Sequence, residues 1–157
     1  MLSPMASWKQ VEEQAPELAA RARAILDALR HKTIATLRAD GSPRISGIEA
    51  AFADGELTFG SMTASRKGAD LVRDPRFALH SAAYDPPEDE AQWEGDAKIA
   101  GRAVSTGSVD GPGDSPAGDA FRADVTEVVV TRLNDAADRL VVESWREGRG
   151  VRRVERE

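Results

Sequence analysis

The sequence LTFGSMTASRKGADLVRDPR (residues 57–76) decides the fold, because it predicts a strand, a basic turn and an amphipathic helix in immediate succession. Residues 57–59 are typical of a strand that follows the turn at residues 54–55. Ala69, Leu71 and Val72 favour a short helix that closes at residues 74–75, Asp-Pro. This order of elements is typical of a phosphate site.

Ser65, Arg66 and Lys67 fall at the predicted start of this helix. Two cations, a hydroxyl and free backbone N–H groups at a positive helix end are what a phosphate dianion requires. A basic pair at an exposed helix start is more often solvated surface, and helix N-termini repel positive charge. With Ser61 nearby, the stretch predicts a phosphate site, and a solvated surface is the alternative.

Alternation with a period of two predicts further strands on both sides of this stretch. They span residues 33–38, 43–50, 56–60, 76–81, 96–104, 121–133 and 139–145. Seven hairpin-joined strands favour an antiparallel barrel over a doubly wound sheet. The fold class is therefore mainly β with flanking helices: an antiparallel barrel with an N-terminal helical segment and a short helix after the third strand.

Three other segments complete a single domain over residues 1–157. Residues 1–31 predict helix, since Ser7 and Gln10 form a capping box and Pro16 suits the first turn of a second helix. Residues 104–119, rich in Gly, Pro, Ser and Asp, predict a flexible loop. Residues 146–157 predict a basic tail, with five arginines against three glutamates.

Composition excludes several classes of function. With 157 residues, the chain is long enough for one domain and too short for two. It lacks an apolar run of spanning length and a secretory signal, so we expect a cytoplasmic protein without a membrane partner. Zero cysteines and two histidines exclude thiolate chemistry and a Cys or His metal site. A net charge of -6 disfavours nucleic acid as a partner.

Residues 44–46 carry a second group of candidates. Arg44 and Ser46 are two residues apart on a predicted strand, so their side chains point to the same face and could share a ligand. A merely polar strand face is the alternative. Gly60 would let a flat ligand approach the backbone closely, although a glycine at a strand end is commonly a turn residue.

The motif SRKG at residues 65–68, preceded by FGSM at 59–62, resembles the flavin-phosphate segment of the pyridoxamine 5'-phosphate oxidases, a family of FMN-binding split barrels. The resemblance extends to DGSPRISGI (40–48) and RDPRFALH (73–80). It covers roughly residues 33–104 well and the remainder weakly. The sequence also resembles small split-barrel proteins of this kind, some of which use a deazaflavin coenzyme instead of FMN. The resemblance implies a homodimer with the cofactor in a cleft between subunits.

The resemblance also implies roles for individual residues. Those that would hold the cofactor phosphate are Arg44, Ser61, Ser65, Arg66 and Lys67. Those that would flank the ring are Ile45, Ser46 and Gly60. Trp145, in VVESW, would close the site from the partner chain, although a core or interface role is equally typical of such a tryptophan. Valine-rich residues 125–130 and 141–142 could supply the apolar dimer interface.

The sequence contains no nucleophile elbow, Walker loop or glycine-rich dinucleotide fingerprint. This is expected of a flavoprotein, because the flavin or deazaflavin ring carries hydride transfer itself. The resemblance therefore implies an FMN- or deazaflavin-dependent oxidoreductase with a small organic substrate. The family carries a substrate-binding Arg and His pair in the region that corresponds to residues 146–157, but no histidine follows His80 in this sequence, so oxidation of the vitamer is not expected. The alternatives are a noncatalytic protein that stores or senses a flavin, haem or other planar anion, and a barrel that has lost its ligand.

Overall fold

The computed structural model describes residues 6–109 and 118–157. The helices are α1 (Trp8–Gln14), α2 (Pro16–Asp27), α3 (Arg66–Arg73) and the short 3-10 helix η1 (Glu90–Gln92). The strands are β1 (His31–Leu37), β2 (Pro43–Ala53), β3 (Glu56–Met62), β4 (Arg76–His80), β5 (Asp96–Val109), β6 (Gly118–Leu133), β7 (Leu140–Arg146) and β8 (Gly150–Arg156). The fold is thus mainly β with flanking helices, as the sequence predicts.

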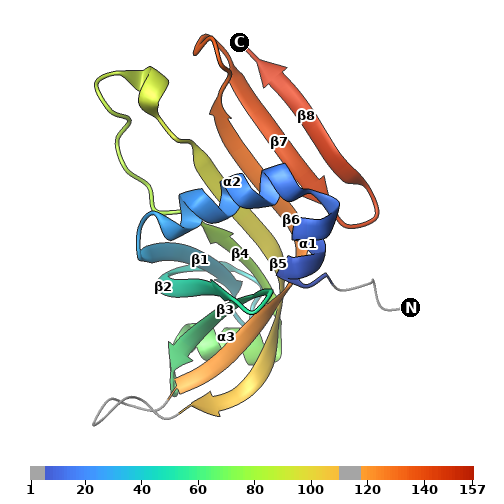
Figure 1. The fold of residues 1–157 in the computed structure, drawn as a ribbon. Coiled ribbons are helices and arrows are strands. Elements are labelled where there is room, and N and C mark those ends of the chain that lie inside the picture. Colours follow the sequence, from blue (N-terminus) through green and yellow to red (C-terminus); the bar gives the residue numbers. More distant parts are fainter. Residues whose placement is uncertain (1–5, 110–117) are drawn as a thin grey trace.

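Six strands form a closed antiparallel barrel. Their order is β3-β2-β1-β4-β5-β6, and β3 pairs again with β6, so the sheet closes on itself. At this closure Phe59 lies opposite Phe121, and their rings stack with centroids 5.9 Å apart inside the barrel. Strands β7 and β8 continue the sheet beyond β6 and extend away from the barrel (Figure 1).

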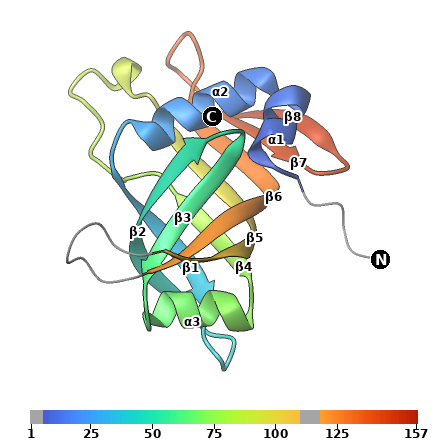
Figure 2. The ribbon, with the colours of Figure 1, turned by 60° about the horizontal axis from the view of Figure 1, so that its bottom comes forward.

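Helices cover the two ends of the barrel. α3 lies across one end, whereas α1 and α2 lie at the other end and against the extension (Figure 2). The capping box of Ser7 and Gln10 is present, and Pro16 lies in the first turn of α2. Leu18, Ala22 and Leu26 repeat at helical spacing and are all buried. The prediction of an N-terminal helical segment is therefore confirmed for residues 8–27, whereas His31 already begins β1 and residues 1–5 lie outside the described residues. Within the described ranges, no helix is long and apolar enough to cross a membrane.

The prediction of a flexible loop at residues 104–119 is wrong at both ends of that segment. β5 continues to Val109 and β6 begins at Gly118, and these two residues pair with each other. Polar residues and glycines can extend a ladder there because backbone hydrogen bonds, not apolar side chains, join the two strands. The rest of the predicted loop, residues 110–117, lies outside the described residues.

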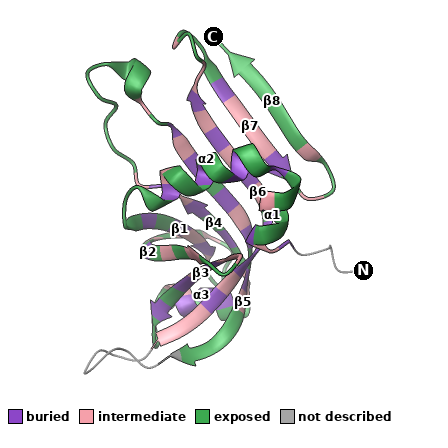
Figure 3. Ribbon diagram, in the orientation of Figure 1, coloured by how far each residue is buried: buried purple, intermediate pink, exposed green. Residues whose placement is uncertain are grey.

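The predicted basic tail at 146–157 is also wrong, because most of it forms the eighth strand. β8 pairs antiparallel with β7 along its length, from Arg146 opposite Gly150 to Leu140 opposite Arg156. Every residue from 151 to 156 is exposed, on both faces of the strand (Figure 3). Alternation of apolar and polar residues reveals a strand only when one face is buried, so it cannot detect this one.

Candidate functional site

The first turn of α3 lies directly against the end of β3. Ser65 caps the helix, and its Oγ accepts a hydrogen bond from the Gly68 N–H at 3.1 Å. A Cβ on Gly68 would lie 2.6 Å from Ser61 Oγ and 2.9 Å from Ser65 Oγ. Only glycine at position 68 therefore lets the two serine hydroxyls approach this turn. The structure brings Ser61, Ser65 and the helix start together, as the sequence predicts.

Ser61 has a buried hydroxyl without a partner. The residue is 7% exposed, and its Oγ makes no hydrogen bond within the described part of the chain. Buried polar groups are hydrogen-bonded in the large majority of cases, so an unpaired one calls for a ligand or a water. Since Ser61 Oγ lies beside the N-terminus of α3, a ligand that accepts hydrogen bonds fits this position.

The two predicted cations differ in their contacts. Lys67 is half-buried, and its Nζ donates to the carbonyl oxygen of Gly47 on β2 at 2.7 Å. An ammonium group has three donors, so two remain. Arg66 is exposed and makes no side-chain hydrogen bond or ion pair with any described residue. Both cations are therefore able to accept an anion at the start of α3.

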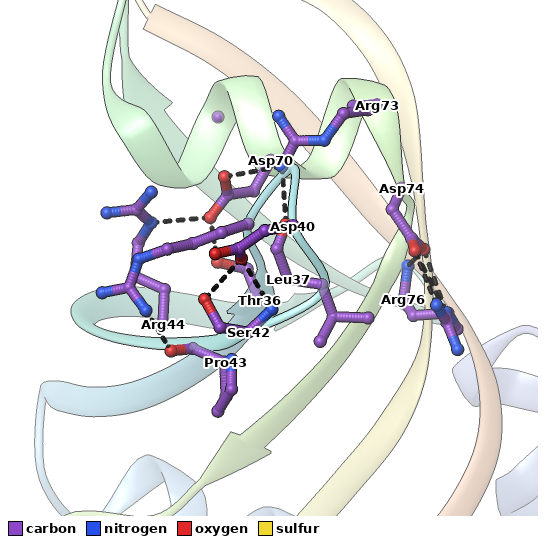
Figure 4. A network of polar contacts seen from close by, with 12 residues as sticks. Thr36, Leu37, Asp40, Ser42, Pro43, Arg44, Asp70, Arg73, Asp74 and Arg76 are labelled. Carbon is purple, nitrogen blue, oxygen red and sulfur yellow. Dashed lines mark hydrogen bonds and ion pairs between the residues drawn. The ribbon is translucent and has the colours of Figure 1, made fainter.

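The other end of this region is a network around Asp70, which is 3% exposed (Figure 4). Asp70 Oδ2 accepts hydrogen bonds from Thr36 Oγ1 and Arg44 Nε, each at 2.7 Å. Asp70 Oδ1 accepts one from Arg73 at 3.0 Å, and Arg73 also donates to the Leu37 carbonyl oxygen at 2.7 Å. The network ties α3 to β1 and β2.

Asp70 stays ionised in the folded protein. Burial alone would raise the pKa of its carboxyl, but the hydrogen bonds from Arg44, Thr36 and Arg73 outweigh burial and hold the pKa at about 2. A buried carboxylate with this number of donors is a stable fixed charge. Arg44 is therefore held by a permanent negative partner.

We expect the free energy of unfolding to fall as the pH is lowered from about 4 to about 2. In that window the unfolded chain takes up a proton at Asp70, whose ordinary pKa is 3.8, and the native protein does not. The contribution is fully present above pH 4 and is lost on passing through the native pKa. Urea denaturation at several pH values measures the slope.

The variant Asp70→Asn is the control for this acid slope and should reduce it. Asp74, whose pKa is also about 2 because Arg76 donates to it, keeps a contribution of the same sign in both proteins. An unchanged slope in the variant would contradict the assignment to Asp70.

The predicted ring contacts do not all lie on one surface. Burial alternates along β2, so Arg44 and Ser46 share a face, as predicted. Ser46 lies opposite the buried Ile34, whereas Ile45 is on the other face and 75% exposed. Of these three, only Ile45 presents its side chain to the outer face of the barrel.

Two separate hollows lie on the outside of the barrel. Ile45 lines one of about 290 Å³, together with small residues such as Ala35 and Ala78. Gly60 lines another of about 470 Å³, formed mainly by β2, β3 and β6. The structure therefore does not place Ile45 and Gly60 around one common hollow.

Trp145 is not available to a cofactor or to a partner chain. It is 0% exposed, and its indole N–H donates to Gln14 Oε1 of α1 at 3.2 Å. The core role is therefore confirmed, and the expectation that Trp145 closes the site from the partner subunit is wrong. The N-terminal helices cover the face of the strand on which Trp145 lies, and this cover is enough to bury its ring.

Sequence patterns missed the residues that organise the site. Thr36, Gly68 and Asp70 are part of it, and none was a candidate. The spacing of Asp70 and Arg73, three residues apart on a predicted helix, was the available signal for a pair. Among the described residues, no group of three His, Cys, Asp or Glu side chains could hold a metal ion.

Residues 18–132 match the sequence profile of the family described as pyridoxamine 5'-phosphate oxidase. No curated protein sequence matches the chain significantly. Among solved structures, the chain is similar to an FMN-binding protein from Nostoc punctiforme, related to pyridoxamine 5'-phosphate oxidase. That likeness has 13% identity and a TM-score of 0.60, and covers 94% of this chain and 96% of that chain.

Two further structures resemble the chain. A heme-binding protein from Mycobacterium smegmatis has 15% identity and a TM-score of 0.52, with 88% of this chain and 87% of that chain covered. An F420 reductase has 17% identity and a TM-score of 0.50, with 68% of this chain and 94% of that chain covered. At these identities the likeness is one of fold.

Proposed function

Because the chain belongs to the pyridoxamine 5'-phosphate oxidase family, we propose that it binds FMN or a deazaflavin coenzyme and transfers hydride to or from a small organic substrate. The observation that carries this proposal is the unpaired, buried Ser61 hydroxyl beside the start of α3. A cofactor phosphate supplies the acceptor that this hydroxyl lacks. Helix N–H groups and three cations complete the site.

The residues present fit a phosphate group. Ser61 and Ser65 each have a hydroxyl hydrogen to donate, since Ser65 uses only its oxygen in capping Gly68. Lys67 keeps its bond to the Gly47 carbonyl oxygen and has donors to spare, and Arg66 supplies a second charge. Arg44 approaches from β2. These five residues would bind and orient the phosphate end of the cofactor.

The cofactor ring, when bound, supplies the hydride-transfer chemistry. The chain has to orient the ring and shield it from water. Ile45 and Gly60 line separate hollows, so a ring on the outer face would contact one of them, whereas Ser46 could contribute only its backbone. The small organic substrate would bind beside the ring.

The absorbance spectrum tests this function directly. We expect the purified protein, titrated with FMN and with a deazaflavin coenzyme, to shift the spectrum of at least one of them. A nicotinamide or reduced deazaflavin donor should then bleach the bound cofactor. Binding without turnover would favour the noncatalytic alternative, a protein that stores or senses a flavin, haem or other planar anion. Binding of none would contradict both.

We also propose that a second copy of the chain covers the outer face around Ile45. The valine-rich segments cannot supply the main interface as expected, because Val125, Val128, Val130 and Val141 are 0% exposed within one chain. Exposed Ile45 and the small residues beside it are a better apolar surface. Cytoplasmic location stays part of this proposal, as do the absence of a nucleic-acid partner and of a membrane partner.

We expect a homodimer at micromolar concentration, with an interface of roughly 2,000 Å² or more in total. Light scattering after size-exclusion chromatography measures the mass. The variant Ile45→Arg should shift the mass toward a monomer, because it places a charge on this apolar surface. A monomeric parent protein with cofactor present would rule the dimer out.

A further inference from the structure

Asp70 binds Arg44 at a single nitrogen of the guanidinium group. The only hydrogen bond that Arg44 makes with described residues runs from Nε to Asp70 Oδ2. Both terminal nitrogens of the guanidinium are therefore free of protein partners in this part of the chain. A hydrogen bond at Nε restricts the orientation of the guanidinium plane. The edge formed by the two terminal nitrogens remains open to another partner. This edge matches two oxygens of a phosphate.

Asp70 is itself held from three directions. Thr36 on β1, Arg44 on β2 and Arg73 on α3 all donate to its carboxylate. Asp70 also lies one turn after Arg66 and Lys67, so it is on the side of the helix that continues from those cations. Asp70 thus lies one helical turn from the phosphate candidates on α3 and is hydrogen-bonded to the one on β2.

We propose that Asp70 is a positioning residue, which holds Arg44 in the orientation that binds the cofactor phosphate. The inference rests on the proposed function, in which Arg44 is a phosphate ligand. Asp70 does not touch the cofactor, because its oxygens are occupied by protein donors and it carries the same sign of charge as a phosphate.

Asp70 could act by positioning Arg44 or through its charge alone. These two roles predict opposite changes in anion affinity when Asp70 is neutralised. Arg44 and Arg73 carry two positive charges against the single negative charge of Asp70. If Asp70 acted through its charge alone, neutralising it would make the site more positive and tighten the binding of an anion. If Asp70 positions Arg44, the same change frees the guanidinium and weakens binding, since ordering Arg44 on binding then costs entropy.

The test uses the full chain with Asp70→Asn, which keeps the shape of the side chain. We expect the affinity for FMN to weaken by roughly 5- to 10-fold, the difference between a charge-assisted and a neutral hydrogen bond. Riboflavin, which lacks the phosphate, should bind both proteins equally. In a protein that already carries Arg44→Met, Asp70→Asn should have no further effect on FMN. Asp74→Asn is the matched control, because it neutralises a carboxylate that is paired with Arg76 rather than with Arg44, and it should leave FMN affinity within about twofold.

The proposal would be overturned if Asp70→Asn left FMN affinity unchanged or made it tighter. It would also be overturned if Asp70→Asn weakened riboflavin binding as much as FMN binding, or if it weakened FMN binding just as much in a protein that carries Arg44→Met. A measurement on the parent protein covers the case in which Asp70→Asn does not fold. By NMR, the Arg44 Nε–H should exchange slowly with solvent, and inorganic phosphate should shift its signal. Fast exchange or no shift would also overturn the proposal. A shift with inorganic phosphate in a protein that binds no flavin or deazaflavin would refute the proposed function and leave the role of Asp70 standing.

Discussion

Replacing Lys67 with alanine is expected to weaken FMN binding by roughly 10- to 100-fold. The substitution removes one charge-assisted hydrogen bond to the phosphate, and such bonds contribute about 1.5 to 3 kcal/mol. The fold should survive, because the only protein partner of the ammonium group among the described residues is the Gly47 carbonyl oxygen. Isothermal titration calorimetry measures the affinity.

Riboflavin and a second lysine are the controls for this experiment. Riboflavin has no phosphate, so it should bind Lys67→Ala and the parent protein about equally. Lys9→Ala removes the same charge from α1, at the other end of the barrel, and should leave both affinities unchanged. If Lys67→Ala weakens riboflavin as much as FMN, or weakens neither, the phosphate assignment at the start of α3 is wrong. For a deazaflavin the phosphorylated and bare forms give the same comparison.

Replacing Trp145 with alanine is expected to lower the free energy of unfolding by about 3 to 5 kcal/mol, the usual cost of truncating a large buried aromatic side chain. Trp145 is fully buried, and its loss would leave a cavity between β7 and α1. Chemical denaturation measures the difference. This is a large part of the stability of a domain of this size.

Trp145→Phe separates packing from the hydrogen bond to Gln14. It keeps most of the buried ring and should cost much less than the alanine variant, since a typical hydrogen bond contributes only about 1 kcal/mol. The folded phenylalanine variant should bind FMN as the parent does. If it kept full stability and lost FMN affinity, Trp145 would have the role near the cofactor that its burial argues against.

The barrel could be predicted from sequence because its strands and turns carry strong local signals. The strand at 43–50 begins at the residue where β2 begins, and Asp54-Gly55 forms the turn into β3 with positive φ at both residues. β8 and the ends of β5 and β6 could not be predicted. Their side chains are polar or exposed on both faces, and only pairing with a neighbouring strand orders them.

The candidate site was predictable only where a motif carries its chemistry in consecutive residues. SRKG places Ser65, Arg66 and Lys67 at one helix start, and the structure has them there. The partner of Arg44 could not be found this way, because Asp70 is 26 positions later in the sequence and looks like one more polar residue of an exposed helix. Its burial depends on how α3 packs against β1, which no local pattern contains.

The contact between Gln14 and Trp145 joins residues 131 positions apart, and this affects the protein during its synthesis. α2 ends at Asp27 and packs on β5, β6 and β7, whereas β6 begins only at Gly118. At about 5 to 20 residues per second, the apolar side of α2 waits roughly 5 to 20 s for β6 to leave the ribosome. Until then Leu18, Ala22 and Leu26 lack the part of the sheet that β6 and β7 supply, so the nascent chain leaves apolar surface open to chaperones.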